Sequence, residues 1–191
     1  MAQPKIENIL FLDIETAPVV YKYNDLNPAV KDLWDKKWAW NPENKPEELY
    51  GKAGVYAEFS KVVCIGLGYY HNNKFRVKAI VNDNEKELLQ EFAELIKTHF
   101  NKAENVLCAH NGKEFDYPFL SRRMIINGVA FPKNFQLQGL KPWDVKHLDT
   151  MEMWRFGDIK NFTSLNLLAN VLNIPSPKDD MDGSQVAKVY Y

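Results

Sequence analysis

Two carboxylates stand two residues apart near the start of the chain, Asp13 and Glu15, directly after the apolar run at residues 9–12. Such a run is typical of a buried β-strand, and side chains two residues apart on a strand point to the same face. Neighbouring carboxylates repel each other unless a cation lies between them. Hard ions such as Mg²⁺ or Mn²⁺ suit this all-oxygen chemistry. An ordinary solvated pair, where a strand leaves the core, stays open as the alternative.

A third carboxylate, Asp116, follows the apolar run at residues 106–109 and lies where a helix is expected to begin. In open α/β sheets, ligands bind at the ends of strands. If the strand that carries Asp13 neighbours the strand that ends at Ala109, the three acids converge. Read alone, Asp116 also fits an ordinary helix-start residue, because Asp is favoured there.

These two stretches carry a family resemblance. Phe11-Leu12-Asp13-Ile14-Glu15-Thr16 resembles the first motif of the DEDD superfamily of 3′–5′ exonucleases, and Asn111-Gly112-Lys113-Glu114-Phe115-Asp116 resembles the second. The chain is most similar to the predicted 3′–5′ exonuclease family related to the proofreading domain of B-family DNA polymerases. The resemblance implies an RNase H-like α/β fold, with a mixed central sheet flanked by helices, in one domain over residues 1–191.

The resemblance also implies an activity and a partner. The expected enzyme hydrolyses phosphodiester bonds at the 3′ end of single-stranded or frayed DNA, with two Mg²⁺ or Mn²⁺ ions as cofactors. The expected partner is single-stranded nucleic acid, DNA rather than RNA, and no membrane. Two alternatives stay open: a non-catalytic nucleic-acid-binding module that keeps the exonuclease fold, and an RNA-trimming exoribonuclease.

By the same resemblance, each motif residue has an expected role. Asp13 bridges both ions, Glu15 holds the ion on the side of the nucleophile, and Asp116 holds the ion on the side of the leaving group. Thr16 lies along the terminal nucleotide, which Asn111 and Phe115 help to position. For Phe115, packing in the core stays open as the alternative, because an aromatic residue at a helix start is often buried.

The superfamily has a fourth acid in a third motif, Tyr-x-x-x-Asp or His-x-x-x-x-Asp, on a C-terminal helix. Tyr21 and Asp25 have this spacing but precede the second motif, and the stretch from His147 ends on Glu152. We treat both as coincidences and expect the helix with the third motif to be missing from the sequence. The chain is therefore expected to be weakly active. Two spare acids remain, and we assign neither to the site: Asp149, expected to be a supporting or structural group, and Asp182.

The elements that position these residues follow from the apolar pattern. Residues 21–57 form an aromatic-rich insertion of short helix and loop. Trp34 and Trp38 are expected to pack on the domain, and stacking of Trp34, Trp38 and Trp40 on the bases of a frayed single strand stays open as the alternative. Residues 62–70 and 75–81 form a hairpin, in which Gly66 and Gly68 indicate close backbone approach. Helices are expected from Asn84, from Asp116 or Tyr117 to Gly128, and over 165–172, and strands at 106–109 and 147–154. A mixed sheet with helices on its faces accommodates this order.

Composition adds few constraints. Of the 191 residues, 46% are apolar and 26% charged, with a formal net charge of −1, so nucleic-acid binding requires a local patch. Residues 113–147 carry such a basic excess: Lys113, Arg122, Arg123, Lys133, Lys141 and Lys146. Cys64 and Cys108 each lie in an apolar run, which favours buried free thiols over a disulfide. We expect a cytoplasmic protein.

Overall fold

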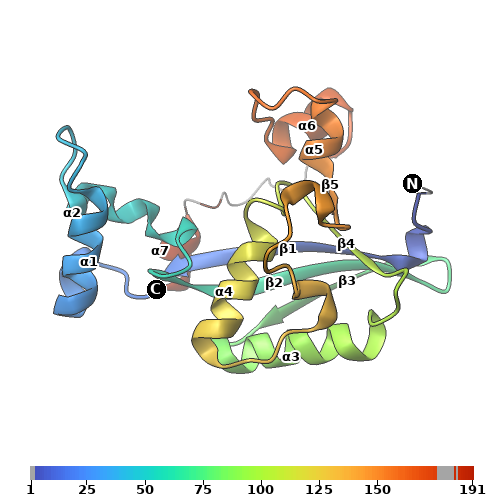
Figure 1. Ribbon diagram of the computed structural model, residues 1–191, viewed down its shortest axis with the longest axis horizontal. Helices are drawn as coiled ribbons and strands as arrows, with labels where there is room; N and C mark the ends of the chain where they lie inside the picture. The colour runs from blue at the N-terminus through green and yellow to red at the C-terminus, as the bar shows by residue number, and fades with distance from the viewer. Residues whose placement is uncertain (1–2, 176–182, 184) are drawn as a thin grey trace.

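The computed structural model describes residues 3–175, 183 and 185–191. Five strands form one sheet in the order β3-β2-β1-β4-β5 (Figure 1). The strands are β1 (Ile9–Pro18), β2 (Ser60–His71), β3 (Lys74–Val81), β4 (Val106–Ala109) and β5 (Leu148–Asp149). β2 pairs antiparallel with β1 and β3, whereas β4 pairs parallel with β1 and β5. The predicted mixed sheet is confirmed, and the strand that carries Asp13 does neighbour the strand that ends at Ala109.

One face of the sheet holds the main core. The alternating residues Leu10, Leu12 and Ile14 of β1 point to this face and are buried. It is covered by α3 (Glu85–His99) and α4 (Asp116–Asn127), which lie on the same side of the sheet in Figure 1. Asn84 caps α3 by accepting from the backbone N–H groups of Lys86 and Glu87. Both helices begin where the sequence predicts, and α4 also ends as predicted, with Gly128 in the left-handed conformation at its C-terminus.

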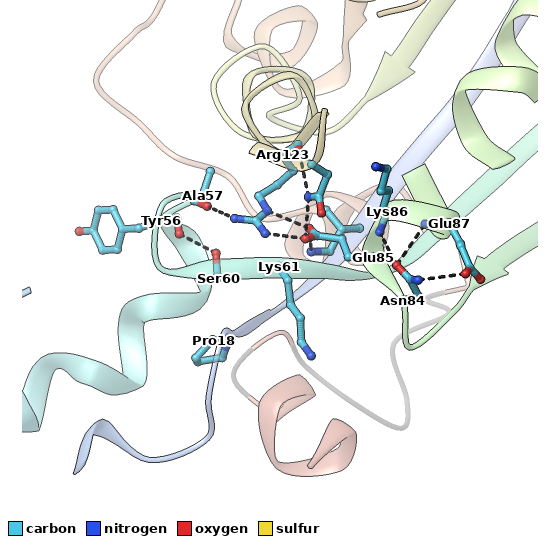
Figure 2. Close-up of polar contacts among 12 residues, drawn as sticks. Pro18, Tyr56, Ala57, Ser60, Lys61, Asn84, Glu85, Lys86, Glu87 and Arg123 are labelled. Carbon is cyan, nitrogen blue, oxygen red and sulfur yellow. Dashed lines mark hydrogen bonds and ion pairs between the residues drawn. The ribbon is translucent and has the colours of Figure 1, made fainter. Parts of the chain in front are cut away.

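A buried ion pair holds α3, α4 and β2 together. Figure 2 shows the guanidinium of Arg123, on α4, reaching both the carboxylate of Glu85 and the carbonyl of Ala57. Glu85 Oε1 also accepts from the backbone N–H of Val62 at 2.8 Å, and Oε2 accepts from Asn127 Nδ2 at 2.9 Å. Because Arg123 is buried and fully engaged, it does not belong to the basic surface that the sequence suggests.

The insertion at residues 21–57 has a small core of its own. It contains the 3₁₀ helix η2 (Tyr23–Asp25), α1 (Pro28–Trp38), α2 (Pro46–Leu49) and the 3₁₀ helix η3 (Tyr50–Val55). Trp34 is fully buried at its centre and donates from Nε1 to the carbonyl of Pro46 at 2.8 Å. Trp38 packs against Trp34 in this separate core rather than on the main core as predicted, whereas Trp40 is largely exposed. The insertion therefore packs as a helical lobe beyond one end of the sheet (Figure 1).

The predicted strand at residues 147–154 is wrong over most of its length. β5 ends at Asp149, and α5 (Thr150–Arg155) begins at the next residue. The reason is local: the Asp149 carboxylate accepts from the backbone N–H groups of Met151 and Glu152 and so caps a helix at this point. α6 (Leu165–Val171) follows with Ser164 as its cap, as predicted. Three further 3₁₀ helices are η1 (Ile6–Asn8), η4 (Lys133–Phe135) and η5 (Pro142–Asp144).

The other face of the sheet is covered only in part by the residues that the structure describes. The short helix α7 (Val186–Tyr190) packs on Ala17 and Val63 through Val186. On β3, the side chains of Phe75, Val77 and Val81 are exposed. A Cβ atom at Gly68 would lie 2.6 Å from Cζ of Phe75, which explains the glycine there. No helix in the described part of the chain is both long and apolar enough to cross a membrane.

Candidate active site

Asp13 and Glu15 lie in the middle of the sheet, on the face opposite the main core. In the register of β1 with β2, Asp13 lies opposite Gly66 and Glu15 opposite Cys64. Asp13 is exposed and Glu15 is half-buried. Burial raises the pKa of the Cys64 thiol, and the charges of Glu15 and then Asp13 raise it further. Because directly opposed residues of paired strands point to the same face, Glu15 lies on the side of Cys64, and Asp13 shares that side, as the period-two pattern predicts.

Asp116 is brought to Asp13 by the start of α4. Its side chain is buried, with 3% of the residue exposed, and Oδ1 accepts from the backbone N–H of Ile14 at 3.2 Å. Burial raises the pKa of this carboxyl from 3.8 to about 7, and the nearby charge of Asp13 contributes next. Hydrogen bonds from backbone N–H groups act in the opposite direction. A buried carboxyl that faces a second carboxylate is a combination often found at functional sites.

The three acids offer oxygen ligands for a hard cation, but they do not form a complete set of metal ligands. Within the described residues, no three His, Cys, Asp or Glu side chains gather closely enough to hold a metal ion by themselves. The structure pairs Asp13 with Asp116 and puts Glu15 on the face of Asp13. Their all-carboxylate chemistry fits Mg²⁺ or Mn²⁺. A cation would relieve the repulsion from Asp13, which adds to the effect of burial in raising the pKa of Asp116.

The turn before α4 is tightly built. Asn111 adopts a left-handed conformation with φ of 63°, and its carbonyl accepts from the backbone N–H groups of Glu114 and Phe115. A Cβ atom at Gly112 would lie 2.5 Å from Cβ of Ala109, so only glycine fits there. The Oδ1 atom of Asn111 is buried and has no hydrogen-bond partner among the described residues. A buried acceptor without a hydrogen-bond partner lowers the stability of the folded protein, and a ligand that donates to it would restore part of that stability.

Asp149 and α5 hold this turn in place, whereas the sequence predicts only that Asp149 is a supporting or structural group and does not identify the turn as its partner. The Asp149 carboxylate accepts from the backbone N–H of Asn111 at 2.9 Å and of Lys113 at 3.1 Å, besides capping α5. Lys113 also pairs with Glu152 on α5 at 2.6 Å. The sequence signal for this cap is an Asp directly before a possible helix start. Asp149 is therefore a structural group, as the sequence predicts, and its carboxylate is occupied by four backbone donors.

The remaining predicted site residues have local partners. The hydroxyl of Thr16 donates to the carbonyl of Gly54 at 2.7 Å, which ties β1 to the helical lobe. Phe115 is half-buried and packs against Phe119 with ring centroids 5.3 Å apart, so it has the core contact that the sequence left open. Asp182 lies outside the described residues. Roles of Thr16, Asn111 and Phe115 at a terminal nucleotide stay predictions.

A hollow lies beside Asp13 on the partly covered face of the sheet. Its volume is about 480 Å³, and it is bounded by Gly66 and Phe75 from the sheet and by His110 and Leu165 beyond the end of β4. His110 is hydrogen-bonded through both ring nitrogens, to the Thr150 hydroxyl at 2.9 Å and to the Thr163 carbonyl at 2.7 Å. Asp13 therefore opens onto space between the sheet and the α5–α6 segment.

Comparison with known proteins shows the family and the fold. The profile of a family described as "Predicted 3'-5' exonuclease related to the exonuclease domain of PolB" matches residues 55–191, a range that includes Asp116 but neither Asp13 nor Glu15. The family B DNA polymerase from the hyperthermophilic archaeon Pyrobaculum calidifontis has a TM-score of 0.53 at 14% identity, over 94% of this chain and 20% of that one. Product-bound exonuclease I has a TM-score of 0.50 at 12% identity, over 95% of this chain and 42% of that one.

The chain thus spans less than half the length of these solved structures. Their likeness shows the RNase H-like fold that the sequence predicts. No curated protein matches the sequence. Because the family profile covers most of the chain, the chain belongs to the family of predicted 3′–5′ exonucleases related to the exonuclease domain of PolB.

Proposed function

We propose that this chain is a divalent-metal-dependent 3′–5′ exonuclease that acts on single-stranded or frayed DNA ends. The observation that carries the proposal is the pairing of Asp13 with the buried Asp116, whose pKa is raised to about 7 by burial and by the charge of Asp13. Two stretches that resemble separate exonuclease motifs supply these residues, and parallel pairing of β1 with β4 supports their convergence. The proposal extends the family relation to the chemistry of particular residues.

In the proposed mechanism Asp13, Glu15 and Asp116 hold two Mg²⁺ or Mn²⁺ ions. Such ions, when bound, supply a hydroxide near neutral pH and stabilise the charge on the leaving oxygen. The protein's part is to present ionised carboxylates at fixed positions. Asp116 must release its proton to act as a ligand, and the N–H of Ile14 orients its Oδ1 atom. Asn111 is placed by Asp149 to accept a hydrogen bond from substrate or from a bound water through its orphaned Oδ1.

The test is cleavage of a single-stranded DNA oligonucleotide labelled at its 5′ end in one sample and at its 3′ end in another, with Mn²⁺, with Mg²⁺ and with EDTA. A 3′–5′ exonuclease gives a ladder from the 5′ label and mononucleotides from the 3′ label, and gives neither in EDTA. Asp13→Ala should reduce the rate by at least about 100-fold, because a metal ion contributes several kcal/mol to the transition state.

The matched control is Asp83→Ala, which removes an exposed acid from the loop before α3 and should leave the rate unchanged. Full activity of Asp13→Ala would refute the assignment. Asp25→Ala belongs in the same series, because it tests the Tyr-x-x-x-Asp spacing in the insertion and should also have no effect.

One observation favours a second candidate, a nucleic-acid-binding module without catalysis. Within the described residues, three acids do not assemble into a metal site. That candidate predicts binding of the oligonucleotide with no cleavage under any metal condition. An RNA oligonucleotide of the same sequence, run in parallel, distinguishes the exoribonuclease alternative.

A further inference from the structure

Two adjoining hollows border the segment that connects α4 to β5. The first, of about 340 Å³, lies between α4 and the segment before β5 and is lined by Lys113 and Arg122 among others. The second, of about 470 Å³, lies by the loop before β4 and is lined by Lys102, Lys133 and Lys146 among others. Leu137 and Leu140 line both hollows, so the two form one groove. We call it the basic groove.

The side chains that line the basic groove carry a net positive charge. Of all the residues that line the two hollows, Asp144 is the only acid, against four lysines and one arginine. Lys113 pairs with Glu152. The other four cations, which are Lys102, Arg122, Lys133 and Lys146, are exposed and pair with no acid that the structure describes. Uncompensated cations lined up in a groove attract a polyanion.

The groove begins beside the candidate active site and leads away from it. Lys113 lies in the turn that Asp149 holds, three residues before Asp116. The far hollow lies at the opposite end of β4, whose four residues span about 13 Å at the usual rise per residue. A linear polyanion that occupied the whole groove would therefore have one end at the start of α4, the helix whose first residue is Asp116.

The groove also has features suited to a flexible strand with bases. Its lining includes the amide side chains of Asn134 and Gln136, besides apolar surface from Leu137. Trp143, 69% exposed, lies beside it, with Lys141 Nζ 5.3 Å from the centroid of its ring. Proteins that bind single strands without sequence preference combine such a cationic groove with aromatic side chains on which bases stack.

We infer that the basic groove binds the phosphodiester backbone of a single strand upstream of the 3′ end that lies at Asp13 and Asp116. The inference rests on the proposed function for the position of the 3′ end, but binding in the groove is independent of cleavage. Lys102, Lys133 and Lys146 neutralise phosphates several nucleotides from the scissile bond. An acidic peptide would be attracted by the same charges, but it would not need a groove that leads to a phosphodiester site.

The test is binding of fluorescent single-stranded oligo-dT by anisotropy in EDTA, where cleavage is absent. The variant Lys133→Glu/Lys146→Glu reverses two charges in the far hollow. The control Lys74→Glu/Lys86→Glu makes the same change in net charge at two exposed lysines outside the groove. For a 20-nucleotide strand, the groove variant should lose at least about tenfold in affinity. The slope of log K against log salt should become shallower by about 1.4, because each of the two lost phosphate contacts contributes about 0.7 on a single strand.

The mononucleotide dTMP should bind the wild type and both variants equally, because it is too short to extend from the candidate active site to the far hollow. Equal loss in the control variant, or equal loss for dTMP, would overturn the inference. The inference would also be overturned if the wild-type protein bound a 20-residue poly-glutamate as tightly as the 20-nucleotide strand. Thermal melting checks that each variant is folded. The variant Lys133→Gln/Lys146→Gln, which only neutralises the two charges, should lose about half as much affinity on a log scale as the charge-reversal variant. If the groove binds DNA but the protein cleaves none, only the proposed function is refuted, and the inference about the groove stands.

Discussion

At the scale of single residues, the environment of Asp116 is the most informative feature of the site. The sequence identifies this residue from the motif that ends in Phe-Asp, and Asp13 and Glu15 from the motif on β1. It also predicts that Asp116 begins a helix and approaches Asp13, but not that its carboxyl is buried or that it accepts from the backbone N–H of Ile14. Those properties depend on how α4 is placed over β1, which only the packing of the core determines.

The raised pKa of Asp116 makes the stability of the metal-free protein depend on pH. The unfolded chain releases the proton near the ordinary value of 3.8, whereas the folded protein keeps it up to about pH 7. The folded state thus binds more protons between these values, so its stability relative to the unfolded state falls as pH rises from about 4 to about 7 and is level above. The full difference in pKa corresponds to a loss of up to about 4 kcal/mol.

The measurement is urea unfolding in EDTA, for the wild type and for Asp116→Asn, across this pH range. Near pH 4 the two should be equally stable, and at pH 8 the variant should be the more stable one. Mn²⁺ at pH 8 should stabilise the wild type more than the variant, because an ionised carboxylate binds the ion more tightly than a neutral amide does. A difference between the two proteins that does not change with pH would show that Asp116 has an ordinary pKa.

At the scale of elements, α5 is a segment where the apolar pattern predicts a strand and the structure has a helix. The run after His147 contains enough apolar residues for a strand, but the side chain of Asp149 ends the strand by capping a helix. The same carboxylate binds the turn that carries Asn111, so one residue connects two elements far apart in sequence. The capped helices α3, α4 and α6 were predictable because their signals are local, whereas the tie between Asp149 and the turn is not.

Replacing Asp149 should therefore affect both stability and activity. Asp149→Ala removes the cap of α5, which costs about 1 kcal/mol, and leaves the N–H groups of Asn111 and Lys113 without their acceptor, at about 1 kcal/mol or more each. We expect a loss of about 2 to 4 kcal/mol in urea unfolding and a lower kcat, because the turn that precedes Asp116 is no longer held.

Asp158→Ala is the matched control, since Asp158 accepts from the backbone N–H of Lys160 in an exposed turn away from the candidate site residues. This substitution should cost no more than about 0.5 kcal/mol and should leave kcat unchanged. An Asp149→Ala protein with wild-type kcat would mean that the turn keeps its geometry without the carboxylate.

At the scale of the whole molecule, the sheet is covered unevenly. The sequence predicts the order of elements and the separate character of the 21–57 insertion, but not that the insertion forms its own core around Trp34. Nor does it predict that Phe75 and Val77 stay exposed beside a hollow next to Asp13. Which faces of a sheet are covered depends on contacts between elements distant in sequence, and these leave no local periodic signal.

The partly covered face leads to a prediction about an extended chain. The resemblance to four-acid exonucleases implies a helix with Tyr-x-x-x-Asp, and we predict that an extension past Tyr191 that carries an amphipathic helix of this kind packs on the face that exposes Phe75 and Val77. Burying these side chains should stabilise the domain by a few kcal/mol in urea unfolding. The added Asp and Tyr should raise the rate of cleavage by about 10²–10⁴-fold, the usual contribution of a positioned acid–base group.

The control is the same extension with Phe and Asn in place of its Tyr and Asp. It should keep the gain in stability, because the apolar face of the helix is unchanged, and lose the gain in rate. Equal turnover by the 191-residue chain and the extended chain would contradict the prediction and would place the fourth acid within the present sequence. Asp149 would be a poor candidate even then, because four backbone N–H groups already occupy its carboxylate. The search would turn first to acids near the hollow beside Asp13.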